Sequence, residues 1–216
     1  MRSTQIRLWR VFPILMLGVA GCATVYTAAE FSDRTAEHET VALLPFDVSI
    51  NLRELPEGLT EEDLRQQERD EAYSFQRQLY TQFLQRYARG QYSVEFQDID
   101  TTNVLLNRAD VDYRAIYLSY TRAELADILG VDAIVSGTIG RSRPMGTGAA
   151  IATTILFGVG VTNRVDTSMT VHDGEDGFLL WSYDHEIDGG LGSTPEGVAE
   201  NLMRGVARSF PYDNNE

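Results

Sequence analysis

Few side chains in this sequence are of the kinds that carry out covalent or metal chemistry. The 216 residues contain one cysteine, Cys22, and three histidines, His38, His172 and His185. No histidine lies in a His-Glu-x-x-His motif or a similar spacing, and a zinc site usually needs three or four protein ligands. The serines fit no nucleophile-elbow pattern, and no pair of carboxylates stands out from an acidic surface. We therefore predict no metal ligands, no catalytic residues and no enzymatic activity.

Two glycine-containing segments could bind a ligand, and each has a simpler interpretation. The run Asp173-Gly174-Glu175-Asp176-Gly177 lacks the alternating acids and the position-12 ligand of a calcium loop. Asp-Gly pairs are typical of hairpin turns, so a turn between two strands is predicted there. The second segment, Gly146-Thr147-Gly148, has Ile151 at the third glycine position of a dinucleotide-binding motif. No cofactor is therefore predicted.

The cysteine stands at the end of a segment that is typical of secretion signals. Arg2, Arg7 and Arg10 precede an apolar run over residues 11–19, and small residues follow. The apolar run is much shorter than the roughly 20 residues that a membrane-spanning helix needs. A basic, then an apolar, then a small-residue region predicts a signal peptide over residues 1–21.

The four residues Val19-Ala20-Gly21-Cys22 resemble the lipobox of bacterial lipoproteins. In that family the chain is cut before the cysteine, whose thiol receives a diacylglycerol and whose new amino group receives another acyl chain. The resemblance implies that Cys22 is the lipidation site and that a membrane is one partner, because two or more acyl chains give stable anchoring. Ala23 resembles the outer-membrane pattern, since enterobacterial lipoproteins retained in the inner membrane have Asp there. The implied location is the outer membrane, with the domain facing the periplasm.

Length and charge limit the classes of function. Removal of residues 1–21 leaves 195 of the 216 residues, which suits one domain. The whole chain has a formal net charge of −14, and the removed segment holds three Arg and no acid, so the mature chain carries −17. Binding to nucleic acid or to anionic lipid needs clustered basic residues. The charge therefore argues against both.

Hydrophobic periodicity divides the mature chain into a tether and a domain. Residues 22–39 are small and polar and predict a flexible tether. Residues 40–216 predict a single α+β domain in which helices pack against a mixed β-sheet. The predicted order is strand, helix, strand, helix, helix, strand, strand, strand, helix. The ranges, in that order, are residues 41–46, 60–89, 92–96, 102–108, 122–129, 131–139, 155–171, 178–187 and 194–210.

The sequence makes a more specific prediction for three residues in or next to these elements. Pro45 cannot donate a hydrogen bond to a β-ladder, so it should lie at a bulge or a strand end. Gly137 should let a neighbouring group pack closely against its strand. Pairing about the turn at residues 173–177 places His172 near Phe178 rather than near His185.

Residues 144–163 contain no charged side chain and lie between Arg143 and Arg164. The simpler interpretation is a buried strand with a glycine-rich lead-in. The alternative is a pair of membrane-barrel strands, which need about 9–11 residues each. The candidate membrane or partner contacts are Ala150, Ile151, Ile155, Leu156 and Phe157.

Three segments of the domain resemble periplasmic domains of the TolB N-terminal type, a group that includes the curli-secretion channel CsgG and the penicillin-binding-protein activator LpoB. Residues 41–46, Val-Ala-Leu-Leu-Pro-Phe, are similar to their opening strand. Residues 125–139 resemble their helix ending in Leu-Gly-(Val/Ala)-Asp and the strand ending in Gly-Thr. Residues 180–183, Leu-Trp-Ser-Tyr, resemble their Leu-Trp segment. The resemblance covers most of residues 40–210 and implies a fold, whereas the partners of its members differ.

These patterns together predict a lipid-anchored cell-envelope protein that acts as a non-catalytic binding or assembly module. The expected partner besides the membrane is an envelope protein or a second copy of the chain, and not a nucleic acid. The first alternative is a secretion-channel subunit similar to CsgG, and the second is an enzyme whose cleft the sequence does not reveal.

Overall fold

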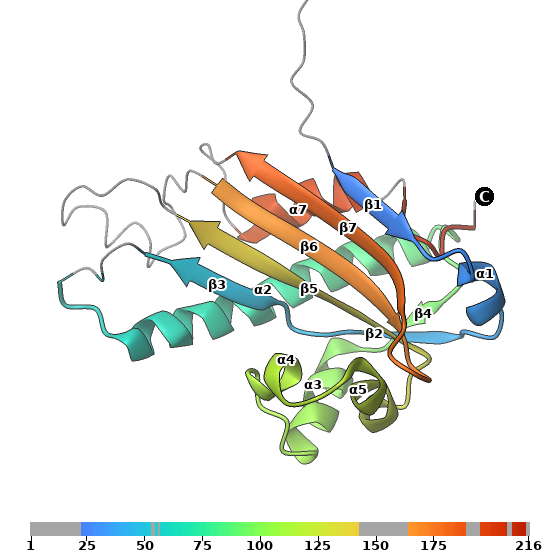
Figure 1. Ribbon diagram of the computed structural model, residues 1–216, viewed down its shortest axis with the longest axis horizontal. Helices are drawn as coiled ribbons and strands as arrows, with labels where there is room; N and C mark the ends of the chain where they lie inside the picture. The colour runs from blue at the N-terminus through green and yellow to red at the C-terminus, as the bar shows by residue number, and fades with distance from the viewer. Residues whose placement is uncertain are drawn as a thin grey trace, which may run out of the picture.

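The computed structural model describes residues 23–52, 55, 57–142, 164–188, 195–206 and 209–214. Within these ranges the chain forms one mixed β-sheet with helices on both faces, the α+β class that the sequence predicts (Figure 1). The strands are β1 (Thr24–Thr27), β2 (Thr40–Leu43), β3 (Asp47–Asn51), β4 (Glu95–Phe96), β5 (Ala133–Ser142), β6 (Arg164–Asp173) and β7 (Leu179–Asp188). The helices are α1 (Phe31–Arg34), α2 (Glu61–Tyr87), α3 (Ile99–Arg108), α4 (Ala115–Leu118), α5 (Arg122–Leu129) and α7 (Pro195–Val206).

The strand order across the described sheet is β1-β7-β6-β5-β2-β4, and β3 also pairs with β5. The pairs β1–β7, β7–β6 and β6–β5 are antiparallel, whereas β2 and β3 lie parallel to β5, and β4 lies parallel to β2. The nine predicted elements are all present, and the structure adds β1, α1, β3 and α4.

Strands β2 and β3 follow the same edge of β5 and are separated by a short break that contains Pro45. Pro45 thus lies between two strand ends, as predicted, where no ladder bond from its nitrogen is needed. The ring of Phe46 packs directly over Gly137 of β5, and a Cβ at Gly137 would overlap that ring. The expectation of close packing at this glycine is therefore confirmed.

Helix α2 packs across one face of the sheet together with α7 (Figure 1). Its N-terminus is fixed by a capping box in which Thr60 and Asp63 exchange hydrogen bonds with each other's backbone amides. Its buried side chains at helical spacing pack into the larger core, where Phe75 meets the ring of Phe46 and Phe83 stacks on Phe96. They include Ala72, Phe75, Leu79 and Phe83. None of the helices in the described part of the chain combines the length and the hydropathy of a membrane-crossing segment.

The opposite face of the sheet is covered only in part. Helices α3, α4 and α5 pack there against Ala42, Leu44 and Ile134 and form a second, smaller core. The rest of this face carries exposed polar side chains and has no helix over it in Figure 1. They include Ser49, Thr138, Asp166, Asp184 and Glu186.

Strands β6 and β7 form the predicted hairpin, and residues 174–178 make its turn. Gly177 has a φ of +75°, which favours glycine. A register shift between Val171 and His172 places His172 opposite Leu179 rather than opposite Phe178. His185 lies opposite Thr167, so the two histidines are far apart on the hairpin, as expected.

The prediction of a flexible tether is wrong for residues 24–39. Thr24–Thr27 form β1, which pairs antiparallel with β7, and residues 31–34 form the short helix α1. The amide of Ala28 continues this pairing with a bond of 2.9 Å to the carbonyl of Leu180. The sequence looks like a tether because an edge strand needs few large apolar residues when its neighbour supplies the hydrogen bonds.

Candidate functional site

A groove of about 900 Å³ lies between the segment after α1, helix α5 and the turn between β6 and β7. Its lining is dominated by acids, with Arg34 and His38 as the basic side chains. The acids are Asp33, Glu37, Glu124, Asp127, Asp132, Asp173 and Glu175. Three parts of the chain that are distant in sequence therefore meet around one negatively charged concavity.

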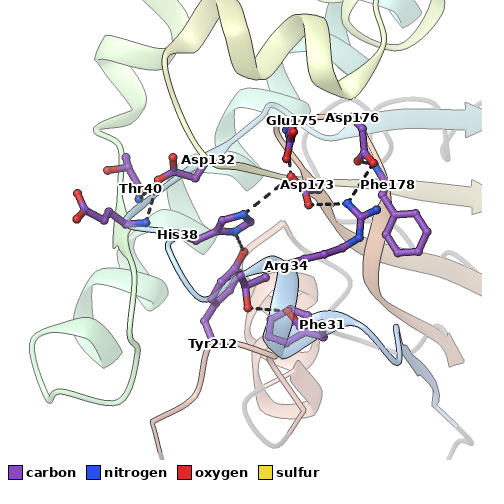
Figure 2. A network of polar contacts seen from close by, with 12 residues as sticks. Phe31, Arg34, His38, Thr40, Asp132, Asp173, Glu175, Asp176, Phe178 and Tyr212 are labelled. Atoms are coloured by element: carbon purple, nitrogen blue, oxygen red, sulfur yellow. Dashed lines mark hydrogen bonds and ion pairs between the residues drawn. The ribbon is translucent and has the colours of Figure 1, made fainter.

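Asp173, the last residue of β6, is the centre of the polar contacts in this groove (Figure 2). It is 3% exposed, so its carboxylate needs partners. One oxygen accepts a hydrogen bond of 3.0 Å from Nη1 of Arg34, and the other accepts the backbone amide of Glu175 at 3.0 Å. The guanidinium of Arg34 also bonds Asp176 at 3.1 Å and lies 4.3 Å from the centre of the Phe178 ring. Arg34 thereby fastens α1 to the hairpin.

Asp132 holds the chain on the other side of the groove, just after helix α5. Its Oδ2 accepts the backbone amides of Glu39 and Thr40, both at 2.8 Å. The carboxylate thus fixes the path by which the N-terminal segment enters β2. This contact gives a structural role to the aspartate of the Leu-Gly-Val-Asp motif.

Gly174 lets the hairpin turn approach this junction closely. Its amide donates a bond of 2.7 Å to the carbonyl of Asp132. A Cβ at this position would lie 2.7 Å from that oxygen and 2.8 Å from the carbonyl oxygen of Val131. A side chain here would push the turn away from α5.

His38 connects the N-terminal segment to the C-terminal part of the chain. Its Nδ1 lies 2.7 Å from the hydroxyl of Tyr212, and its Nε2 lies 3.9 Å from Asp173 (Figure 2). Burial lowers the pKa of His38, although the charges of Asp173 and Asp132 oppose that shift. Burial also raises the pKa of Tyr212 far above its ordinary value. Tyr212 therefore keeps its proton, and a hydrogen bond joins its hydroxyl to the imidazole of His38.

These contacts hold the groove's frame together, and other carboxylates remain at its rim. The buried Tyr212 keeps its proton, and Asp173 and Asp132 are occupied by amides and a guanidinium. Within the described residues no three His, Cys, Asp or Glu side chains converge as ligands of a metal ion. Exposed acids such as Asp127 and Glu175 give the groove a negative potential. The arrangement is suited to recognition of a positively charged surface.

The site residues that the sequence predicts all lie outside the described part of the chain: Cys22, Ala150, Ile151, Ile155, Leu156 and Phe157. Sequence reasoning missed the groove itself. Two signals pointed to its parts: the acidic turn that begins at Asp173 and the motif that ends at Asp132. Nothing in the local sequence marks Arg34 or Tyr212 as their neighbours.

The sequence matches no protein-family model and no curated protein. Solved bacterial structures do match the chain. The lipoprotein GNA1162 from Neisseria meningitidis is 14% identical over 79% of this chain and 95% of that chain, with a TM-score of 0.44. PelC from Paraburkholderia phytofirmans, solved as a dodecamer, is 14% identical over 91% and 100%, with a TM-score of 0.45. The LpoB C-terminal domain from Salmonella enterica is 10% identical over 73% and 92%, with a TM-score of 0.38. LpoB, one of the proteins that the sequence motifs resemble, is thus among the structural neighbours.

Proposed function

We propose that this protein is a lipid-anchored component of the bacterial cell envelope, attached to the outer membrane through Cys22, and that it binds another envelope protein without catalysing a reaction. One observation carries the proposal. The cysteine of the lipobox-like segment lies two residues before Thr24, where β1 begins, and β1 is paired in register with β7. A lipid on Cys22 would therefore be attached almost directly to the folded sheet.

The groove supports the binding part of the proposal. Its frame is fixed by buried contacts of Asp132 and Asp173, so its shape is already formed without a partner. Preorganised sites lose less free energy on binding than sites that must order first. The exposed rim acids favour a partner with a basic segment, because opposite charges steer association and set specificity. Asp132, Asp173 and Tyr212 are engaged in contacts that hold the frame of the groove together, and this favours recognition over catalysis.

The membrane attachment is tested by comparing the wild-type protein with Cys22→Ser. The wild-type protein should incorporate a radioactive or alkyne-labelled fatty acid and fractionate with the outer membrane. The Cys22→Ser protein should incorporate none and lose that fractionation. Acyl labelling that persists in Cys22→Ser would contradict the proposal.

Contact of the uncharged segment with the membrane remains part of the proposal. The residues concerned are Ala150, Ile151, Ile155, Leu156 and Phe157. Ile151→Asp together with Leu156→Asp should weaken binding of the acylated protein to vesicles, since charge is costly in an apolar phase. Unchanged binding would remove these residues from the site.

The groove is tested with a photo-crosslinking amino acid at Glu175, with a probe at Glu200 of α7 as the matched control. Both positions are exposed, but Glu200 lies on a different element that does not line the groove. A discrete adduct from position 175 should form in cells and should disappear when Asp127→Arg reverses a neighbouring charge. An adduct that survives Asp127→Arg, or that forms equally from position 200, would contradict binding in the groove.

A further inference from the structure

The position of β1 fixes where a lipid on Cys22 would lie relative to the sheet. Thr24 lies opposite Asp184 of β7, and two residues can span at most about 7 Å. A lipid on Cys22 would therefore be attached within about 7 Å of the start of β1. The amide of Ala28 and the clasp between Arg34 and Asp173 hold the rest of this segment in place.

Strand β7 continues beyond Asp184 to Asp188, toward the same end of the sheet. The register joins Ser142 of β5 to Arg164 of β6, and Arg164 to Asp188 of β7. The C-terminal ends of β5 and β7 and the start of β6 therefore lie together at one end of the sheet, four residues of β7 beyond the level at which β1 begins (Figure 1). We call this the β1-start end.

The acidic groove lies at the other end of the same strands. Strand β6 runs from Arg164 at the β1-start end to Asp173 in the groove, and its nine residue steps at about 3.3 Å each span roughly 30 Å. Through Asp184, Thr24 is level with Ser168 of β6, so the start of β1 is five steps, or roughly 17 Å, from the level of Asp173. Because β1 runs antiparallel to β7, it begins on the side away from the groove and runs toward it.

We infer that the acylated protein stands upright on the bilayer, with the β1-start end toward the lipid headgroups and the acidic groove at least roughly 17 Å away from them. This inference rests on the proposed function, because it requires the lipid on Cys22. It adds a lipid-facing surface and a fixed direction for the groove, which would open into the periplasm toward its partner.

Charge disfavours the alternative in which the domain lies flat on its uncovered sheet face. The exposed side chains of Asp166, Asp184 and Glu186 belong to that face. Asp166 and Glu186 are directly opposite each other in the register of β6 and β7. Pressing these carboxylates against anionic headgroups would place like charges together at low separation. The upright orientation leaves this face in water.

The orientation is measured on the full acylated protein in vesicles of phosphatidylethanolamine and phosphatidylglycerol that contain a nitroxide-headgroup lipid. Because the native thiol is acylated, a single introduced cysteine takes a fluorophore uniquely. Asn51→Cys, opposite Ser142 at the end of β3, reports the β1-start end, Asp184→Cys reports the uncovered face and Glu175→Cys reports the groove; all three positions are exposed. Quenching at position 51 should be several-fold stronger than at positions 184 and 175. Equal quenching, or stronger quenching at position 184 or 175, would overturn the upright orientation.

A linker variant separates orientation from simple attachment. About 20 Gly and Ser residues inserted between Ala23 and Thr24 would span about 25 Å and free the domain to rotate. The insertion should keep the protein on the vesicles and abolish the difference between positions 51 and 175. A difference that persists unchanged would show that the short connection does not set the orientation. If the protein without the insertion fails to bind vesicles at all, the lipid anchor is overturned as well. If that protein binds but is quenched equally at all labelled positions, only the orientation is overturned.

Discussion

Nη1 of Arg34 lies 3.0 Å from Oδ2 of Asp173, an ion pair between residues 139 positions apart in the chain. The carboxylate is almost completely buried, whereas the arginine side chain is 30% exposed. The pair ties the segment that follows β1 to the hairpin that borders the acidic groove. It therefore fastens the N-terminal segment at the groove end of the sheet.

Substitution of Arg34 by Gln should loosen the N-terminal segment locally. Asp173 would keep the amide of Glu175 but lose its cation, and α1 would lose its link to the hairpin. Hydrogen exchange of the Ala28 amide should accelerate relative to amides at the centre of β5. Arg65→Gln is the matched control, because it breaks an exposed pair with Glu62 elsewhere. Equal exchange of Ala28 in both variants would exclude a clasp.

Gly174→Ala should destabilise the protein by about 1–3 kcal/mol, the usual cost of forcing an extra group into a filled space. The new Cβ would meet the carbonyl oxygens of Asp132 and Val131. Gly140→Ala is the control, since the nearest atoms to its added Cβ lie at 3.8 Å. Urea unfolding of the two variants measures the difference. A Gly174→Ala protein as stable as Gly140→Ala would mean that the turn can move away from α5 at little cost.

Glu71 of α2 and Arg141 of β5 form a second buried ion pair, with side chains 8% and 9% exposed. Glu71→Leu or Arg141→Met alone should cost about 3–5 kcal/mol, because each leaves one buried charge without its partner. The double variant Glu71→Leu with Arg141→Met should recover most of that loss, since it removes both charges together. Chemical denaturation of the four proteins gives the coupling energy. Losses that simply add in the double variant would contradict a paired role.

Stability should fall in mild acid because of His172. Burial, assisted by the charge of Arg122, lowers the pKa of His172 to about 4. In the unfolded chain the pKa is about 6.5, so below that value the unfolded state binds a proton that the folded state does not. The contribution of His172 is complete above about pH 6.5 and is lost as the pH falls toward about 4. For a side chain that is partly exposed, we expect a loss of roughly 1–2 kcal/mol.

The measurement is urea unfolding of wild type and His172→Gln over that pH range. The variant should have a shallower pH dependence than the wild type. At about pH 8, where the histidine is neutral in both states, the difference between the proteins reports only the packing change. Parallel pH curves would show that His172 does not contribute to the acid sensitivity.

Much of the fold could be predicted because its signals are local. Thr60 and Asp63 cap α2 with groups three residues apart, and the Asp-Gly turn needs only the residues within it. The alternating apolar residues of β6 face the core because side chains on a strand alternate between its two faces. Pro45 and Gly137 similarly follow from the backbone properties of single residues. The lipobox resemblance is also a short, contiguous pattern.

Only the tertiary structure decided the rest. Residues 24–27 look like part of a tether, yet β7 offers them a free edge, and the hydrogen bonds that stabilise β1 come from that distant strand. The groove arises where Arg34, Asp132 and Asp173 meet, although each residue lies in a different part of the sequence. Local periodicity reports which face of an element is buried, but not which element it will be buried against. The sequence by itself therefore determined the elements and the predicted anchor, whereas long-range strand pairing decided the rigid connection of the N-terminal segment and the site at the far end of the sheet.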